Sequence, residues 1–170
     1  THTGTTGTAT VSGTLNGVAI ADSARVEFVV ASGPLTWTGT VSDDWNVAGN
    51  WSRGVVPTAT DTVIISGTIA RQPRLTDGNK AVQRMEMTAN ATLALGGFTL
   101  TIGGDLVAPT GTVSTGTVVM SGTPTTISGT VPALQVTGSI ATSAPTRTTA
   151  AVSVSGKLTV IDQPLTISIP

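Results

Sequence analysis

Residue types that commonly build active sites are scarce in this sequence. Cysteine is absent, so disulfides give no information about the compartment in which the chain works. The one histidine, His2, stands next to the first residue, and a catalytic triad has no other histidine to use as its base. Nucleophilic catalysis with a histidine base is therefore excluded, and we expect no cofactor.

Charge is also sparse. Asp, Glu, Lys and Arg make up 10% of the residues, and the formal net charge is -1, whereas about 25% of an ordinary soluble domain is charged. The chain therefore lacks the excess of positive charge that binding to nucleic acid or to an anionic membrane needs. The sequence also lacks the run of about 18 apolar residues that a membrane helix needs, a signal peptide and a lipidation motif. We expect neither nucleic-acid binding nor membrane insertion, and the chain is either cytosolic or a piece of a longer protein.

Threonine, glycine and β-branched aliphatic residues are abundant instead. Threonine forms about a fifth of the chain, and there are 20 glycines. Stiff β-branched side chains favour strands over helices, and no segment has a convincing helical period. Hydrophobic residues make up 39% of the chain, enough to form a core. These features predict an all-β protein.

One short pattern recurs along the chain: two apolar residues flank one intervening residue, and a glycine follows two places after the second. The glycines of four consecutive matches are separated by about 18, 16 and 18 residues, which indicates a structural repeat. Two earlier matches are "VIISG", which ends at Gly67, and the weaker "MEMTA", which ends at Ala89. The four later matches are "LTIGG" at 100, "VVMSG" at 118, "LQVTG" at 134 and "VSVSG" at 152.

The spacing identifies the repeating unit as a strand. Residues at i and i+2 share one face of a strand, whereas a helix would need i, i+3 and i+4. A glycine after the strand permits positive φ at a sharp corner. Strands and corners repeated every roughly 16 to 22 residues predict a parallel β-solenoid, or β-helix, of about six coils over residues 58–170. The sequence does not decide whether the solenoid is right-handed or left-handed. The predicted structural core consists of Val63, Ile65, Leu100, Ile102, Val118, Met120, Leu134, Val136, Val152 and Val154.

All three tryptophans, Trp37, Trp45 and Trp51, fall just before the first predicted coil. Large rings there would cover the exposed end of an aliphatic stack, so we predict a tryptophan-rich cap over residues 34–57. This stretch resembles the opening that leads into the β-helical stalks of large bacterial surface proteins of the autotransporter and haemagglutinin types. The residues that carry the resemblance are Trp37, Gly39, Asp44, Trp45, Asn50, Trp51, Gly54, Pro57, Asp61 and Val63.

The later repeats, from "TGTVVMSG" onwards, also resemble the repeats of those surface proteins. Together the resemblances span most of the chain. They imply an extracellular, cell-surface segment of a repetitive adhesin that does no catalysis and serves as a stiff stalk or fibre-forming unit. The chain lacks the amino-terminal secretion signature of two-partner-secreted haemagglutinins, so the secretion route stays open.

Residues 1–33 have a different pattern. "ATVSGTL" and "SARVEFVV" each alternate apolar and polar residues around a turn at Asn16-Gly17, which predicts an antiparallel β-segment. It resembles the last two strands of the bacterial immunoglobulin-like repeats found in invasin-type surface proteins, and the resemblance implies that most of such a domain would lie upstream. The residues expected on one side of this segment are Val26, Phe28 and Val30.

The final stretch, "PLTISIP", places Leu165, Ile167 and Ile169 on one face of an unfinished coil. An open solenoid end presents unpaired backbone groups to other chains. We therefore expect the native chain to continue into adjacent domains, or copies of it to associate end to end.

Other interpretations of the cap segment depend on particular side chains. An exposed Trp37, Trp45 or Trp51 would suit a carbohydrate-binding module with surface glycans as partners. Calcium binding near Asp43 and Asp44 is a further hypothesis, because these residues, Asn46 and Asn50 together supply several hard oxygen ligands. Asp and Asn are equally the ordinary residues of turns, which bond their own backbone, and we expect no metal.

An enzymatic interpretation lacks its residues. Glycoside hydrolysis needs a pair of carboxylates, but the adjacent Asp43 and Asp44 would point opposite ways in extended backbone. The later coils share no register among their charged residues, which are Asp105, Arg147, Lys157 and Asp162. We therefore expect no catalytic residues.

Two further patterns have plain structural explanations. Thr99 and Thr101 have the alternate spacing of a water-ordering, ice-binding face, but the equivalent positions of later coils do not keep threonine. The basic stretch over residues 71–84 is expected to be a solvated loop that bulges from a long coil, with a contact patch for an acidic surface or glycan as the alternative. Its cations are Arg71, Arg74, Lys80 and Arg84.

Overall fold

The computed structural model of this protein describes residues 7–11, 14–15, 18–19, 24–28, 33–160 and 164–167. Contacts divide the chain into two compact units, Thr1–Gly33 and Pro34–Pro170. The one helical element among the described residues is the 3-10 turn η1 (Ala48–Asn50). No helix in this part of the chain has the length and apolarity needed to span a membrane.

The first unit contains two antiparallel strand pairs. β1 (Gly7–Val11) pairs with β4 (Ala24–Phe28), and β2 (Thr14–Leu15) pairs with β3 (Val18–Ala19). The antiparallel segment predicted for this region is therefore confirmed, while its resemblance to immunoglobulin-like repeats stays a prediction. The predicted turn at residues 16 and 17 lies outside the described residues, as do residues 2, 30 and 169 and the side chains of residues 26 and 28.

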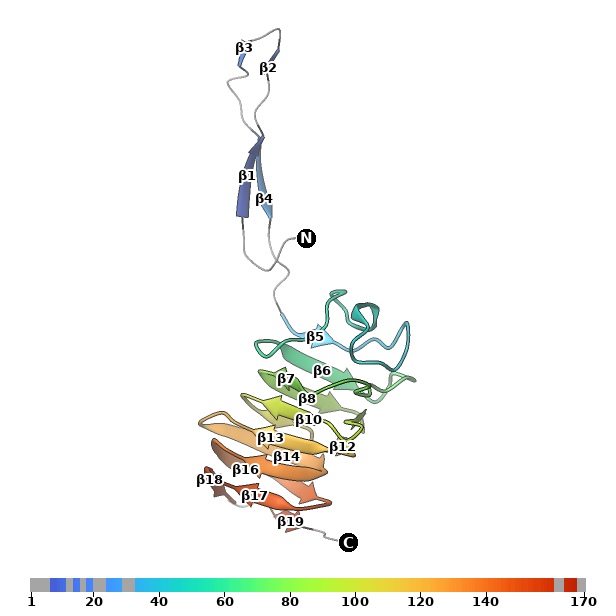
Figure 1. Cartoon of the computed structure of the whole chain (residues 1–170), viewed down its shortest axis with the longest axis vertical. Coiled ribbons are helices and arrows are strands. Elements are labelled where there is room, and N and C mark those ends of the chain that lie inside the picture. Colours follow the sequence, from blue (N-terminus) through green and yellow to red (C-terminus); the bar gives the residue numbers. More distant parts are fainter. Residues whose placement is uncertain are drawn as a thin grey trace. The chain divides into compact units, whose positions relative to one another are not determined.

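The second unit is a parallel β-solenoid of about six turns, as predicted. Its strands stack in three ladders, and Figure 1 shows the successive coils as tiers. The first ladder contains β5 (Leu35–Thr36), β6 (Thr62–Ser66), β8 (Arg84–Thr88), β11 (Leu106–Val107), the first parts of β14 (Thr125–Val131) and β16 (Ser139–Thr148), and β18 (Lys157–Thr159).

The other two ladders complete each coil. From β6 onwards, strands that follow one another along the chain enter different ladders, so neighbours within a ladder come from consecutive coils, and all of these pairings are parallel. The second ladder contains β9 (Thr92–Ala94), β12 (Thr112–Ser114), the second parts of β14 and β16, and β19 (Leu165–Ile167). The third contains β7 (Lys80–Val82), β10 (Thr99–Ile102), β13 (Thr117–Met120), β15 (Ala133–Val136) and β17 (Val152–Val154).

The third ladder has the register that the repeat predicts. The four later matches of the pattern form β10, β13, β15 and β17, and their apolar residues align in two columns. A slip of one residue would turn both columns towards solvent, so the inward alternation fixes the register. One column contains Leu100, Val118, Leu134 and Val152, and the other contains Ile102, Met120, Val136 and Val154.

The two earlier matches of the pattern belong to a different ladder. "VIISG" supplies β6 and "MEMTA" supplies β8, and they pair through Val63 with Met85 and Ile65 with Met87. The expectation that all six matches repeat one position of the coil is therefore wrong. Every face of a solenoid needs alternate inward residues, so the same local pattern arises on two faces and only the strand pairing separates them.

The corner glycines serve a different purpose from the predicted one. Gly122, Gly138 and Gly156 follow strands of the third ladder, and none of them has a positive φ. A Cβ added at any of the three would lie 1.9 Å from the carbonyl oxygen of the glycine stacked against it, which for Gly122 is Gly103. These glycines therefore allow stacked corners to approach closely, where any side chain would collide with the neighbouring coil.

The hydrophobic core runs through the middle of the solenoid. Val152 packs against this core but is only partly buried, and Val154 is 47% exposed, so the core prediction is wrong for Val154. Both lie on β17, the last strand of the third ladder, and among the described residues no strand stacks beyond it. The other eight predicted core residues are buried: Val63, Ile65, Leu100, Ile102, Val118, Met120, Leu134 and Val136.

Candidate functional site

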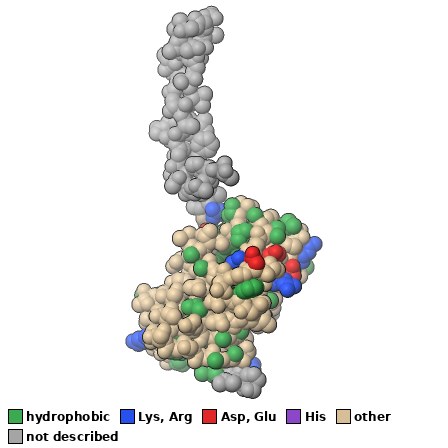
Figure 2. Space-filling view, viewed as in Figure 1, with side chains coloured by type: hydrophobic (Ala, Val, Ile, Leu, Met, Phe, Trp, Pro, Cys, Tyr) green, Lys and Arg blue, Asp and Glu red, His purple; other side chains and the backbone are tan. Residues whose placement is uncertain are grey.

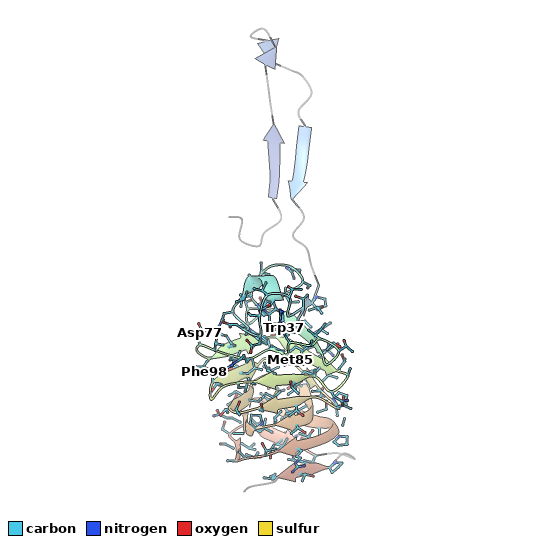
Figure 3. The ribbon with its side chains drawn as sticks, turned by 90° about the vertical axis from the view of Figure 1, so that its right-hand side faces the viewer. Trp37, Asp77, Met85 and Phe98 are labelled. Carbon is cyan, nitrogen blue, oxygen red and sulfur yellow. The ribbon has the colours of Figure 1, made fainter. Side chains whose placement is uncertain are left out.

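A cluster of three tryptophans closes the N-terminal end of the solenoid, as the cap prediction requires. Trp37 and Trp45 are fully buried, and Trp51 is 2% exposed. The Trp51 ring meets both of the others edge to face, with ring centroids 5.0 Å from Trp37 and 4.7 Å from Trp45. Figure 3 shows Trp37 within the stack, above Met85. Because all three rings are buried, none offers an open face on which a sugar could stack.

Hydrogen bonds fix two of the three indoles. Trp37 Nε1 donates to the Arg71 carbonyl oxygen at 2.6 Å, and Trp51 Nε1 donates to the Trp45 carbonyl oxygen at 2.8 Å. Trp45 Nε1 is buried without a partner among the described residues. The cluster is therefore held both by ring packing and by bonds to the backbone of the cap and of the second coil.

A segment antiparallel to β5 ends the first ladder. Ser52 N donates to the Thr36 carbonyl oxygen at 2.9 Å, and Trp37 and Trp51 form an antiparallel bridge. These bonds use the backbone groups that β5 would otherwise present to another strand. On its other side β5 pairs in parallel with β6, so the solenoid begins within the segment predicted as cap, ahead of the expected boundary at residue 58.

Asn50 is buried and organises the loop that precedes it. Its Oδ1 accepts hydrogen bonds from Val41 N and Ser42 N, both at 2.9 Å. Its Nδ2 donates to Ser42 Oγ at 3.0 Å and to the Asp44 carbonyl oxygen at 2.8 Å. Two acceptor sites and two donors are thereby occupied, which is the whole capacity of an amide side chain. Sequence reasoning considered Asn50 as a metal ligand and missed this structural role.

The other side chains considered for calcium also have partners within the protein. Asp44 Oδ1 accepts from Asn46 N at 2.9 Å, the arrangement of an ordinary Asx turn. Asp43 faces Arg74, with its Oδ2 3.9 Å from Nη1. Among the described residues, no group of three or more His, Cys, Asp or Glu side chains is placed to hold a metal ion.

Lys80 and Asp77 join the cap loop to the second coil. Lys80 occupies a position that pairs with the buried Leu100, yet its Nζ reaches Asp77 Oδ1 at 3.0 Å. Its aliphatic stem therefore lies along the core while the ammonium group remains at the surface. The hydrogen bond from Lys80 lowers the pKa of Asp77, and Asn46 Nδ2 donates to the same oxygen.

The basic stretch over residues 71–84 is exposed at Arg71, Arg74 and residues 76–79, as a solvated loop predicts, but it is part of the second coil, so the predicted bulge is wrong. Arg74 bridges in parallel to Asp44 and to Ala94, and residues 80–82 form β7. The Arg71 guanidinium donates to the carbonyl oxygens of Gly39 and Thr40 at 2.9 and 2.8 Å. Arg71 and Arg74 therefore link the second coil to the cap, whereas Lys80 and Arg84 contact Asp77, Glu86 and Asp105.

Charged side chains gather near the cap end of the solenoid on the face seen in Figure 2. Arg84 contacts Glu86 and lies 3.7 Å from Asp105, and Asp105 accepts hydrogen bonds from Thr126 N and Oγ1. This outer network joins three consecutive coils. In the described later coils the charged residues are Arg147 and Lys157, which lie in different ladders.

The outward threonines do not form a regular array. Thr99 pairs with Thr117, but the next residue of that column is Ala133; Thr101 is followed by Val119 and Gln135. The rank of Thr99 therefore ends after two coils and that of Thr101 after one. In the second ladder, Thr92, Thr112 and Thr130 stack over three coils before Arg147 ends that rank.

The C-terminal end of the solenoid has no counterpart of the cap among the described residues. β17, β18 and β19 are the last strands of their ladders. Apolar side chains on or beside these strands are exposed: Val154 at 47%, Val160 at 51% and Ile167 at 49%. Within the described residues, β17, β18 and β19 therefore pair on one side only, and apolar side chains on or beside them are exposed.

Sequence reasoning missed the polar interior of the last coils. Thr142, which pairs with the buried Ile127, and Thr148, which pairs with the buried Val131, are themselves buried. The signal was available, because threonine alternates with other residues in "IATSAPTRT" as aliphatic residues do in earlier strands. Thr and Val share a β-branched shape, so either fits the same position of the stack.

Fold and cap together define a parallel β-solenoid whose N-terminal end is covered by a tryptophan cluster. A family model described as Domain of unknown function (DUF8693) matches residues 36–128, more than half of the chain, and the protein belongs to this family. The match runs from β5 through the cap and into β14. No curated protein and no solved structure matches the chain.

Proposed function

We propose that this chain is a non-catalytic structural segment of an extracellular bacterial surface protein, in which the solenoid is a stiff spacer. The observation that carries the proposal is the unbroken stack of parallel ladders around one buried core. Each inner coil is hydrogen-bonded along its strands to the coil above and the coil below, and repeat stacks of this kind resist bending because every unit contacts both neighbours.

The composition of the surface supports the same role. The outward positions of the third ladder carry short uncharged side chains such as Thr101, Val119, Gln135 and Ser153. The carboxylates near the cap are engaged in ion pairs and turns. The resemblance of the cap and repeats to bacterial β-helical stalks supports the cell-surface location.

Two measurements test the spacer proposal. Antibodies against the folded chain should label intact cells of the source organism; labelling that appears only after lysis would contradict a surface location. In single-molecule pulling between the two ends of the solenoid, the molecule should extend little before it yields, and then unfold in coil-sized steps. Smooth extension at low force would contradict a stiff spacer.

The glycan-binding alternative is disfavoured by the burial of the tryptophans, and tryptophan fluorescence tests it. With Trp37, Trp45 and Trp51 buried, the emission maximum should be blue and insensitive to acrylamide or iodide. A red maximum that these quenchers reduce, and that shifts on addition of an oligosaccharide, would favour a sugar-binding surface instead.

A further inference from the structure

Two stretches of the chain have the pattern Asn-x-Ser/Thr with a middle residue other than proline. They are "NWS" at residues 50–52 and "NAT" at residues 90–92. In secreted proteins this pattern accepts a sugar on the side-chain nitrogen of the asparagine, and it occurs in surface loops. The pattern alone treats the two asparagines alike, whereas the structure places one in the interior and the other at the surface.

Asn50 cannot carry a sugar in the folded chain. Its side chain is fully buried, and its Nδ2 donates to Ser42 Oγ and to the Asp44 carbonyl oxygen. A sugar on Nδ2 would replace one of these two hydrogens, break the bond that it makes, and need space that the cap loop fills. Asn50 therefore provides an internal control with the same pattern and the opposite environment.

Asn90 lies at the tip of the corner between β8 and β9, and it is exposed. Ala91 N donates to the Thr88 carbonyl oxygen at 3.0 Å, which closes a tight turn with φ of 51° at Ala89 and 58° at Asn90. Asparagine in a turn commonly uses its side chain to bond its own backbone. Among the described residues, however, Asn90 bonds only through its backbone N, which donates to Thr110 Oγ1 at 3.2 Å. Its side-chain amide is thus not needed to hold the turn.

The hydroxyl group that completes the pattern is also accessible. Ala91 is fully buried, so the residues on either side of it, Asn90 and Thr92, face outward. Gln72 Oε1 accepts a hydrogen bond from Thr92 N at 2.9 Å and fixes the start of β9, while Thr92 Oγ1 has no partner among the described residues. An enzyme that approaches from solvent therefore meets both groups of the pattern.

The surface around this corner has room for a bulky polar group. On one side the neighbouring corner contains Gly67, which lies against Ala89, and on the other side it contains the exposed Pro109 and Thr110. None of these side chains is large or charged. A chain with 10% charged residues and a net charge of -1 has few other groups to hydrate its surface, and an attached glycan is strongly solubilising.

We propose that Asn90 is a glycosylation site, at which a glycosyltransferase attaches a sugar from a donor whose anomeric carbon carries a diphosphate. The bond between this carbon and the diphosphate oxygen breaks, a bond from the carbon to Asn90 Nδ2 forms, and one Nδ2 proton passes to a base of the transferase. The diphosphate leaves with the electron pair, so nothing is oxidised or reduced. The inference rests on the proposed surface location, because the pattern is used in secreted proteins.

The first test is mass spectrometry of the protein isolated from cells of the source organism. After proteolysis, the peptide that contains Asn90 should be heavier than its sequence mass by one or more sugar residues, and the peptide that contains Asn50 should have its sequence mass. An Asn90 peptide at its sequence mass would overturn the proposal. Equal occupancy at Asn50 would overturn it as well, because exposure in the folded chain would then not select the site.

Substitutions at Thr92, expressed in the same cells, test whether the pattern directs the attachment. Thr92→Val keeps the β-branched shape and removes the hydroxyl group, so the sugar should be lost, whereas Thr92→Ser keeps a hydroxyl group and should retain it. Thr112→Val makes the same change at the residue that pairs with Thr92 in the next coil, and it should leave the sugar in place. Circular dichroism should show unchanged strands in all three variants. A Thr92→Val protein that keeps its sugar would contradict the proposed site.

Asn90→Asp covers the case in which Thr92→Val does not fold. Aspartate also adopts the left-handed backbone conformation of this turn, but it lacks the amide nitrogen, so the added mass should disappear. Added mass that persists on this peptide would place the sugar on another residue and overturn the proposal. Antibody labelling of intact cells reports the location separately: labelled cells with an unmodified Asn90 would overturn this inference and leave the spacer proposal standing.

Discussion

The coils near the tryptophan cap and the later coils that the structure describes share the same ladders but have different interiors. Near the cap the centre holds large apolar side chains, among them Trp37, Met85 and Leu93, all fully buried. In the last coils the centre contains threonine, with Thr146 and Thr148 at 2% and 0% exposure. The interior of the stack therefore accommodates either apolar side chains or threonine, where the shapes of the side chains match.

The difference teaches that register and stability have separate causes in this fold. Backbone ladders and close glycine corners repeat through both regions and keep the coils in line. Burial of large apolar side chains stabilises chiefly the cap region, since removal of apolar area from water contributes about 25 cal/mol per Å². In the later coils that the structure describes, buried hydroxyl groups lower that contribution, so we expect stability to fall along the solenoid away from the cap.

The largest effect should come from placing a charge at a buried position of one column of the third ladder, and the comparison is the same charge at an exposed position of that column. Val136→Asp buries a carboxylate among Met120, Leu134 and their neighbours, where it has no partner, and it should cost more than about 4 kcal/mol and unfold much of the stack. Val154→Asp alters the next residue of the same column at an exposed site, and it should cost less than about 1 kcal/mol. Urea unfolding followed by circular dichroism measures both.

Equal losses from these two substitutions would contradict the assigned register, because they would place residues 136 and 154 in the same environment. A Val136→Asp protein with unchanged unfolding would contradict it more strongly, since it would put Val136 at the surface.

An intermediate effect is expected at the corners. In Gly138→Ala the added Cβ would meet the carbonyl oxygen of Gly122, so two inner coils must separate, at a cost of about 1–3 kcal/mol. Gly156→Ala creates the same 1.9 Å approach to Gly138, but within the described residues the β17 strand before it pairs on one side only, so this corner can shift outward. Thermal melting should show the smaller loss for Gly156→Ala, and a larger loss there would mean that the last corner is as firmly held as the inner ones.

The sequence allowed most of the third ladder to be predicted residue by residue, because four matches at nearly constant spacing define a register. It did not allow "VIISG" and "MEMTA" to be assigned to their ladder, since inward alternation is common to every face. The tryptophan cap was predictable from the position of the rings. The pairing of β5 with an antiparallel segment was not predictable, because it depends on backbone hydrogen bonds at Thr36 and Ser52 that follow from no side-chain pattern.

The roles of polar residues were the hardest to predict. Asn50 and Arg71 act through bonds to backbone groups in the cap, and such bonds leave no periodic pattern. Exposure of Val154 depends on what stacks beneath it, and its local pattern is identical to that of buried Val136.

A substitution in the later coils should stabilise them slightly and so reduce the difference in stability between these coils and the cap region. Thr148 Oγ1 is buried without a hydrogen-bond partner among the described residues. Thr148→Val keeps the β-branched shape and removes the unpaired hydroxyl, and it should stabilise the protein by about 1 kcal/mol. The control, Thr146→Val, removes a hydroxyl that donates to the Ile127 carbonyl oxygen at 3.2 Å, so it should stabilise less or destabilise. Denaturant midpoints that rank the two variants in the opposite order would contradict this assignment.

The smallest expected effect concerns pH and belongs to the cap end. The hydrogen bond from Lys80 holds the pKa of Asp77 below its ordinary value. A carboxyl group of this kind stabilises the folded state above its unfolded pKa, near 4, and loses that contribution as the pH falls through the lower folded value. In Lys80→Met the apolar stem remains, so an NMR titration should show the Asp77 pKa rising towards its ordinary value, while Lys157→Met in β18 should leave it unchanged. An unchanged Asp77 pKa in Lys80→Met would mean that the hydrogen bond from Lys80 does not cause the lowered value.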